Sequence, residues 1–380
     1  MREAKGLSRE EVEEKLILGP GWIGRLEEGE IRPSLDFLLA VLDAIGASLG
    51  ELVAAAGLPD QTTDAPLALD RDLAAEVDGD DLIVTFPYAK HDARYRLPGA
   101  SIEAFEEVLE AMRDGLAKLS DGSDQDDPGI KRSAVASSFL IAIERWPQVN
   151  PSDIWNFVIA RAYMDPFNHP AEFSRLDFGQ SWKRAGGWAL EEILVRKYQK
   201  PLAAHGIRIF IADGDEKERL VSRLKVADRL EADKADVFLT ATPENDPVCF
   251  GIVHVKASFA ERRTDDVPMS KALVDAGYFS PLWTMDGKST PSADPFNRGE
   301  LGKILDPDKD KDNRSAKRKD IEVDGYFSAC FSYNANTAAT PEDQDVAARI
   351  YVCDFSDVDD DHFVRETVEA WRRFDANATG

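Results

Sequence analysis

Three charged residues, far apart in the sequence, have the types and positions that phosphodiester hydrolysis requires. Asp236 lies at the start of an apolar segment predicted to be a strand, residues 235–242, and Lys256 ends the next such segment, residues 248–256. Glu191 lies on a predicted helix upstream. Two acids and a lysine in this arrangement can converge at one edge of a sheet.

Each of the three residue types has a task in such a reaction. Carboxylates bind Mg²⁺, which prefers hard oxygen ligands and retains several waters. The metal ion polarises the phosphate and helps to deprotonate an attacking water, while a lysine orients that water or neutralises developing charge. Asp and Lys are also common at strand ends for the simpler reason that the chain leaves the sheet for solvent there, so spacing alone leaves both interpretations open.

The elements that must position these residues form an α/β pattern from residue 130 onward. Apolar segments predict strands at 207–212, 235–242, 248–256, 278–284, 325–333 and 348–354. Helices are predicted at 132–146, 151–163, 179–204, 266–276 and 359–374. The polar segment 286–320 is predicted to be a long insertion loop.

The first third of the chain has a different organisation. Residues 1–58 predict a small all-α unit, in which Ser8 and Glu11 have the spacing of a capping box. Residues 59–129 predict an acidic linker, a hairpin over 81–97 and a helix over 101–119. We therefore expect three domains, 1–58, 59–129 and 130–380.

Composition limits the classes of function. The 46 basic residues against 71 acidic ones give a net charge of −25 and a pI near 4.6, so a nucleic-acid ligand requires that basic residues gather in one cleft. Three separated cysteines exclude a disulfide framework and a cysteine-rich zinc site. No apolar run suits a membrane span and the polar N-terminus does not suit a secretion signal, so we expect a cytoplasmic protein without a membrane partner.

Three segments carry a resemblance to a known family. Residues 253–266, 180–191 and 331–334 resemble type II restriction endonucleases of the PD-(D/E)xK superfamily, and most of all the BsaWI-like branch, which cuts sites built on CCGG. The resemblance implies a restriction-endonuclease-like mixed sheet flanked by helices. It also implies Mg²⁺-dependent cleavage of double-stranded DNA at a CCGG-related palindrome with 5′-phosphate ends, a homodimer, and a cognate DNA methyltransferase in the host.

The resemblance assigns roles to the three charged residues. Asp236 corresponds to the central metal ligand, Lys256 to the catalytic lysine and Glu191 to the helix-borne acid, which also contributes to metal binding. His254 stands where the family has a second carboxylate, two residues before the lysine.

The missing carboxylate must then come from elsewhere in the chain. Because relatives with CCGG sites supply an acid from the following helix, Asp266 is the first candidate for the metal ligand and Asp265 the second.

The segment after the lysine suggests how bases are recognised. Ser258 follows Lys256, and Glu261, Arg262 and Arg263 begin the next predicted helix, although Ala260 replaces the family's leading arginine. Arginine can donate two bonds to guanine and glutamate can accept one from cytosine, so this set is predicted to contact DNA. The alternative is an exposed helix start held by ion pairs.

The N-terminal unit resembles a Cro/repressor-type helix-turn-helix. Residues 6–16 and 21–34 match its two central helices, and Arg25 on the second of them is predicted to contact DNA. Residues 1–60 nevertheless hold six basic and twelve acidic side chains. A docking or dimerisation module that has lost DNA binding is the alternative.

Taken together, the residues and the resemblance predict a type II restriction endonuclease, a site-specific deoxyribonuclease. The competing hypothesis is a helix-turn-helix transcription regulator with a non-catalytic C-terminal domain, which binds DNA without cutting it.

Overall fold

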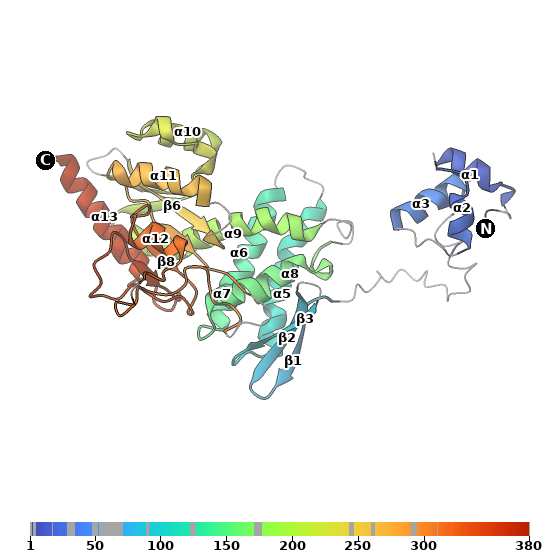
Figure 1. Cartoon of the computed structure of the whole chain (residues 1–380), viewed down its shortest axis with the longest axis horizontal. Helices are drawn as coiled ribbons and strands as arrows, with labels where there is room; N and C mark the ends of the chain where they lie inside the picture. The colour runs from blue at the N-terminus through green and yellow to red at the C-terminus, as the bar shows by residue number, and fades with distance from the viewer. Residues whose placement is uncertain are drawn as a thin grey trace. The chain divides into compact units, whose positions relative to one another are not determined.

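The computed structural model describes most of the chain, which forms two compact units, Met1–Ala68 and Leu69–Gly380 (Figure 1). The described residues are 2, 5–16, 18–28, 35–47, 52, 71–88, 91–121, 127–170, 177–242, 247–259, 263–289, 295–309 and 311–379.

Within its described residues the N-terminal unit contains the helices α1 (Arg9–Lys15), α2 (Trp22–Glu27) and α3 (Leu35–Ala44). The predicted capping box is present: the Ser8 hydroxyl accepts from the Glu11 N–H and the Glu11 carboxylate accepts from the Ser8 N–H. Apolar side chains from the three helices form a core of Val12, Ile23, Val41, Leu42 and Ile45.

A buried carboxylate joins the first two helices of this unit. Glu13 of α1 is 6 % exposed and accepts from the N–H groups of Gly21 (3.1 Å) and Ile23 (2.8 Å) at the start of α2. Gly21 has a left-handed backbone and offers no side-chain cap, so Glu13 supplies the missing acceptors.

The second unit begins with a small antiparallel sheet of β1 (Ala74–Asp78), β2 (Asp81–Tyr88) and β3 (His91–Leu97). The predicted hairpin is confirmed as β2 and β3. The acidic segment before the hairpin was expected to be linker, and this was wrong for β1. That strand is mostly exposed and lacks the apolar alternation that marks a half-buried strand.

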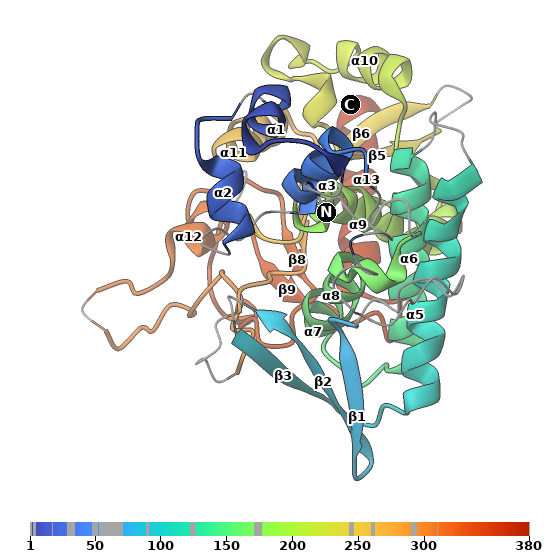
Figure 2. The same ribbon diagram turned by 90° about the vertical axis from the view of Figure 1, so that its right-hand side faces the viewer.

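Two long helices follow the small sheet. α5 (Ile102–Ala117) and α6 (Asp127–Arg145) run side by side (Figure 2). The Ser138 hydroxyl donates to the Val108 carbonyl (2.7 Å), and Gly115 meets Ala134 so closely that a Cβ would stand 2.5 Å from the Ala134 side chain. This contact makes the small sheet and its helices continuous with the rest of the unit.

The main sheet has six strands in the order β4-β5-β6-β7-β8-β9. Their bounds are β4 (Ile207–Phe210), β5 (Val237–Ala241), β6 (Val248–Lys256), β7 (Leu282–Thr284), β8 (Cys330–Ser332) and β9 (Ile350–Val352). The strands β4 to β6 are antiparallel and β6 to β9 are parallel. The predicted mixed α/β sheet is confirmed.

Helices cover both faces of β5 and β6 (Figure 1). On one face Phe238 and Ile252 belong to a cluster with residues of α10 (Gly214–Ser222) and α11 (Arg263–Asp275). On the other face Leu239 and Val253 pack in the main core with α9 (Phe178–Ala203). Because side chains alternate along a strand, the two helices α9 and α11 approach the same strand ends from opposite sides.

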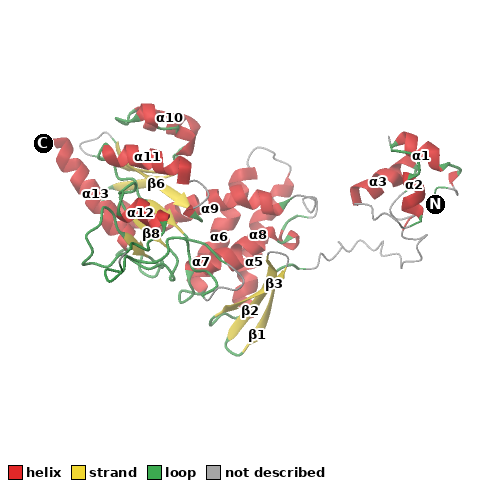
Figure 3. Ribbon diagram, in the orientation of Figure 1, coloured by secondary structure: helices red, strands yellow, loops and turns green. Residues whose placement is uncertain are grey.

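The remaining helices bring one correction. The predicted helix over 151–163 is present as α7 (Pro151–Asp153), a π-helical segment (Ile154–Ile159) and α8 (Ala160–Met164), and α13 (His362–Thr379) ends the chain. The expected loop 286–320 contains α12 (Ala316–Glu322), whose N-cap is Ser315, while the chain before α12 is drawn mainly as loop (Figure 3). Among the helices that the structure describes, none has the length and apolarity to cross a membrane.

Candidate active site

The end of β6 brings a lysine against a carboxylate from the start of β5. The Lys256 ammonium lies 2.6 Å from Asp236 Oδ2, and the same oxygen accepts from the Val255 N–H at 2.8 Å. Asp236 is 7 % exposed. β5 begins at residue 237, so Asp236 lies directly before the strand. Its carboxylate accepts from the Val255 N–H in place of a backbone carbonyl and holds Lys256 in position.

A second carboxylate reaches the lysine from α11. Asp266 is 3 % exposed, and its Oδ1 lies 3.6 Å from Lys256 Nζ. Asp265, the other candidate, is exposed and lies 3.9 Å from Lys234 instead. Neighbouring positions on a helix point about 100° apart, so only one of the two can face the strand end.

The third acid comes from α9 on the opposite face of the sheet. Burial, together with the negative charge of Asp236, raises the pKa of Glu191 to about 8. The positive charges of Lys217, Lys256 and Arg132 oppose this rise in the pKa. Glu191 and Asp236 are therefore close enough to repel each other, as carboxylates do when they share one site.

His254, at the position of the absent family carboxylate, is a buried neutral imidazole. Burial lowers the pKa of His254 to about 4, and its Nε2 lies 3.0 Å from the Ser280 hydroxyl. Its Nδ1 lies 3.9 Å from Asp266 Oδ1. The histidine thus faces Asp266 but brings no negative charge to the site.

The donor set suits a hard divalent cation in its chemistry. Asp236 and Asp266 already hold one cation, the Lys256 ammonium, between them, and repulsion between Glu191 and Asp236 is what a bound cation would relieve. Within the part of the chain that the structure describes, no three His, Cys, Asp or Glu side chains are gathered closely enough to hold a metal ion. To hold a metal ion, these carboxylates would have to move closer together than they stand here.

The predicted DNA-contacting residues are distributed differently. Ser258 is half-buried just after β6, and Arg25 is exposed on α2 in the other unit. Glu261 and Arg262 lie outside the described residues. Arg263 is the first residue of α11, and only its backbone is described.

Sequence reasoning missed one lysine beside the site. Lys217 of α10 donates to the carbonyl of Ala235 (2.6 Å), the residue before Asp236, and its charge acts on Glu191. No local pattern singles out Lys217, because it is one of several charged residues on a short polar helix.

The chain is similar to known proteins in two separate segments. A family model described as BsaWI restriction endonuclease type 2 matches residues 215–356, and one described as a helix-turn-helix domain matches residues 1–56. The type II restriction enzyme AgeI of Thalassovita gelatinovora is 40 % identical over 238 residues, covering 60 % of this chain and 81 % of that enzyme.

A solved structure extends the comparison to the fold. The crystal structure of a specific restriction endonuclease AgeI–DNA complex matches with 33 % identity and a TM-score of 0.62, covering 78 % of this chain and 99 % of that one. On these matches in sequence and fold, the chain belongs to the type II restriction endonuclease family that includes AgeI, whose members are site-specific deoxyribonucleases.

Proposed function

We propose that the chain cuts double-stranded DNA at a CCGG-related palindrome in a Mg²⁺-dependent reaction that leaves 5′-phosphate and 3′-hydroxyl ends. The observation that carries this proposal is the convergence of Asp236, Lys256 and Asp266 at the ends of β5 and β6. Glu191 completes the set from the other face of the sheet.

Each residue has a role that follows from its position. Asp236, Glu191 and Asp266 would hold Mg²⁺, which when bound polarises the phosphate and lowers the pKa of water. Lys256 is positioned to orient the attacking water or to neutralise charge on the phosphate oxygens. Water adds to phosphorus, the P–O3′ bond breaks, and the O3′ atom takes a proton, so the phosphate remains on the 5′ end.

We further propose a homodimer, because a two-fold symmetric site is cut on both strands when each protomer cuts one. Ser258, Glu261, Arg262 and Arg263 would contact the DNA from the segment between β6 and α11. A cognate DNA methyltransferase in the host would protect the same sites. Localisation in the cytoplasm follows from these partners.

Plasmid DNA incubated with purified protein and Mg²⁺ tests the proposal. We expect discrete fragments with the wild type and none with Asp236→Ala or Lys256→Ala. Asp275→Ala is the matched control, because Asp275 is exposed and pairs with Lys271 on the same helix. Ligation of the products to unphosphorylated adaptors tests for the 5′-phosphate, and sequencing of the fragment ends gives the site.

The helix-turn-helix match raises the alternative of a regulator that binds without cutting. Intact DNA together with a retained gel shift would support it. Membership in the endonuclease family and the assembled acids and lysine favour the enzyme instead.

A further inference from the structure

The chain after β7 forms a short two-stranded ladder before it continues to α12. The Arg298 N–H donates to the Lys288 carbonyl (3.1 Å), and Ser289 and Asn297 form an antiparallel bridge. The Lys288 N–H also donates to the Asn297 side chain (2.9 Å). These paired segments, 287–289 and 297–299, are called the basal ladder below.

The basal ladder starts beside the catalytic lysine. Lys256 pairs with Thr284 in the parallel register, and the Met285 N–H donates to the Lys256 carbonyl (3.2 Å). The Gly287 N–H then donates to the Ala257 carbonyl (3.0 Å). Because β6 and β7 are parallel, both leave the sheet at the edge that carries the proposed active site, and the ladder leaves with them.

Asp286 fixes both ends of the loop that contains the basal ladder. It is 1 % exposed and adopts φ = +43°, a left-handed conformation that non-glycine residues rarely take. Its carboxylate accepts from the N–H groups of Glu300 (2.6 Å) and Leu301 (3.2 Å) and from the Thr337 hydroxyl (2.6 Å). Such strain persists only where the surroundings over-determine it, and it is concentrated at functional sites.

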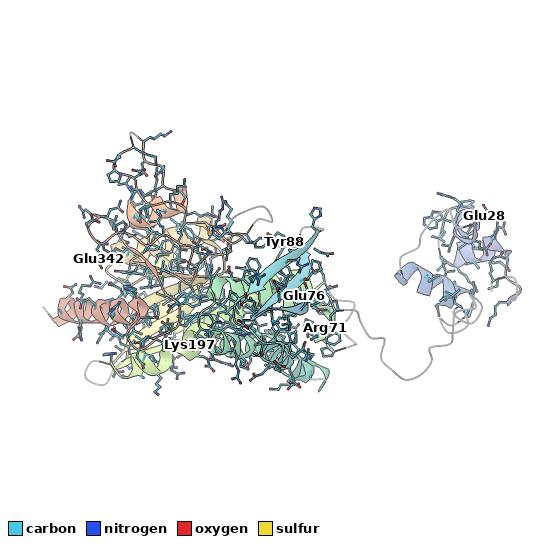
Figure 4. The ribbon with its side chains drawn as sticks, turned by 90° about the horizontal axis from the view of Figure 1, so that it is seen from below. Glu28, Arg71, Glu76, Tyr88, Lys197 and Glu342 are labelled. Atoms are coloured by element: carbon cyan, nitrogen blue, oxygen red, sulfur yellow. The ribbon has the colours of Figure 1, made fainter. Side chains whose placement is uncertain are left out.

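Buried contacts hold the inner face of the basal ladder. The Asn297 amide donates to Ser152 Oγ (2.8 Å) and Asp153 Oδ1 (2.9 Å). The Tyr88 hydroxyl, at the end of β2 and labelled in Figure 4, donates to the Ser289 carbonyl (3.0 Å). The ladder is therefore anchored to the small sheet as well as to the main one.

The outer face of the basal ladder carries two cations. Ser289 and Asn297 face the interior, and alternate pairs of an antiparallel ladder face opposite sides, so Lys288 and Arg298 share the outer face. Both are exposed.

We propose that Lys288 and Arg298 form a phosphate clamp that grips the DNA backbone beside the scissile bond. The proposal rests on the active site proposed above, since its place is defined relative to Lys256. The two cations are exposed, lie side by side on a rigid ladder and stand at the active-site edge of the sheet. These properties suit a DNA phosphate, because a phosphate is recognised by its negative charge whatever the base sequence. In a chain with a net charge of −25, such local cations are what allows DNA to approach.

The test measures DNA binding by the full chain at several salt concentrations. Lys288→Gln, Arg298→Gln and the double variant are titrated in EDTA against a 30-bp duplex that carries the cleavage site mapped from plasmid digests, and against a scrambled duplex. We expect the slope of log K against log salt concentration to become less steep by about 1 for each single variant and about 2 for the double variant, on both duplexes.

A control variant shows whether loss of any exposed lysine changes the salt dependence of DNA binding. Lys200→Gln removes an exposed lysine near the end of α9, at the sheet edge remote from Lys256, and should leave the slope unchanged. Slopes of the clamp variants equal to wild type would overturn the proposal. A loss confined to the site duplex would also overturn it, because it would indicate base contacts in place of phosphate contacts.

Cleavage measurements separate this proposal from the proposed function. At DNA concentrations below KM the clamp variants should cut more slowly than the wild type, because weaker binding of the DNA backbone raises the apparent KM. If wild-type protein cuts no DNA, the proposed activity fails, while the salt slopes on the scrambled duplex still decide the clamp. Melting curves of each variant check that the fold is retained.

Discussion

Asp265 and Asp266 are adjacent in the sequence, yet only Asp266 lies against Lys256. We expect Asp266→Asn to reduce the single-turnover cleavage rate on the order of 100-fold, the size typical of removing one preorganised polar group from an active site. Asp265→Asn should stay within about threefold of wild type, because Asp265 is exposed and faces Lys234. Equal losses in the two variants would show that Asp266 has no special role.

Which residues could be predicted depends on how local their signal is. Asp236 and Lys256 stand at the ends of apolar segments, so their meeting follows from two neighbouring strands. Asp286 and Asn297 gave no such signal, because their partners at 152, 153 and 337 are remote in sequence and polar residues in a polar segment look like solvent-exposed loop. The catalytic roles of Asp236, Lys256 and Glu191 stay predictions.

At the scale of elements, protonation of Asp286 makes the stability of the loop after β7 depend on pH. Burial raises the pKa of Asp286 to about 6, and the nearby Glu300 charge adds to the rise. Because the folded state then binds the proton more tightly than the unfolded chain, the free energy of unfolding falls as pH rises from about 4 to about 6. The contribution is up to about 3 kcal/mol for this group.

Replacing the titrating carboxyl tests this coupling. Asp286→Asn should flatten the decline of the melting temperature between pH 4 and pH 6, since the amide does not titrate. Asp275→Asn, at an exposed position, should leave the pH profile unchanged. A profile for Asp286→Asn that parallels the wild type would contradict the assignment.

Buried side-chain ion pairs, in addition to apolar packing, hold the helix α12 in place. Arg318 and Glu322 form an ion pair in which both side chains are fully buried, and Arg314 also reaches Glu322 at 3.1 Å. Arg318→Met leaves the Glu322 carboxylate partly uncompensated in the interior. We expect a loss of about 3 kcal/mol in the free energy of unfolding, measured by urea titration with tryptophan fluorescence.

A surface pair between α12 and the segment before it provides the control. Lys319 lies 3.3 Å from Asp312 and is partly exposed, so Lys319→Met should cost less than about 1 kcal/mol. If both variants shift the urea midpoint equally, the buried pair contributes no more to the free energy of unfolding than the surface pair does.

Elements with apolar patterns were predictable and those held by polar contacts were not. The segments that became β5 and β6 are runs of buried apolar residues, and their prediction was confirmed. β1 is mostly exposed and α12 is rich in charge, so neither shows the periodicity that marks burial. Their stability comes from partners that only the folded chain supplies.

For the whole molecule the dominant property is its net charge of −25. Self-repulsion of this size opposes compaction, and added salt screens it. We expect the melting temperature at pH 7.5 to rise by roughly 1.5–3 °C as NaCl increases from about 0.05 M to about 0.5 M, equivalent to about 1–2 kcal/mol. Near the pI of about 4.6 the same addition should have little effect. A fall with salt at pH 7.5 would contradict the expectation.

This chain is longer than the AgeI chain in the solved complex. The AgeI structure is matched over 99 % of its length by only 78 % of this chain, so about a fifth of the chain has no counterpart there. A helix-turn-helix family model matches residues 1–56 of this chain. An additional module of this kind is visible in sequence because its helix caps and apolar positions are local.

Glu13 has a consequence for that module. The amino end of a helix ordinarily attracts anions, because its amide hydrogens point outward unsatisfied. In α2 two of those hydrogens are already engaged by a carboxylate of the same unit. The Glu13 carboxylate would repel a nucleic-acid phosphate that approached this helix end. Attraction of the unit to DNA there would therefore depend on cationic side chains such as Arg25.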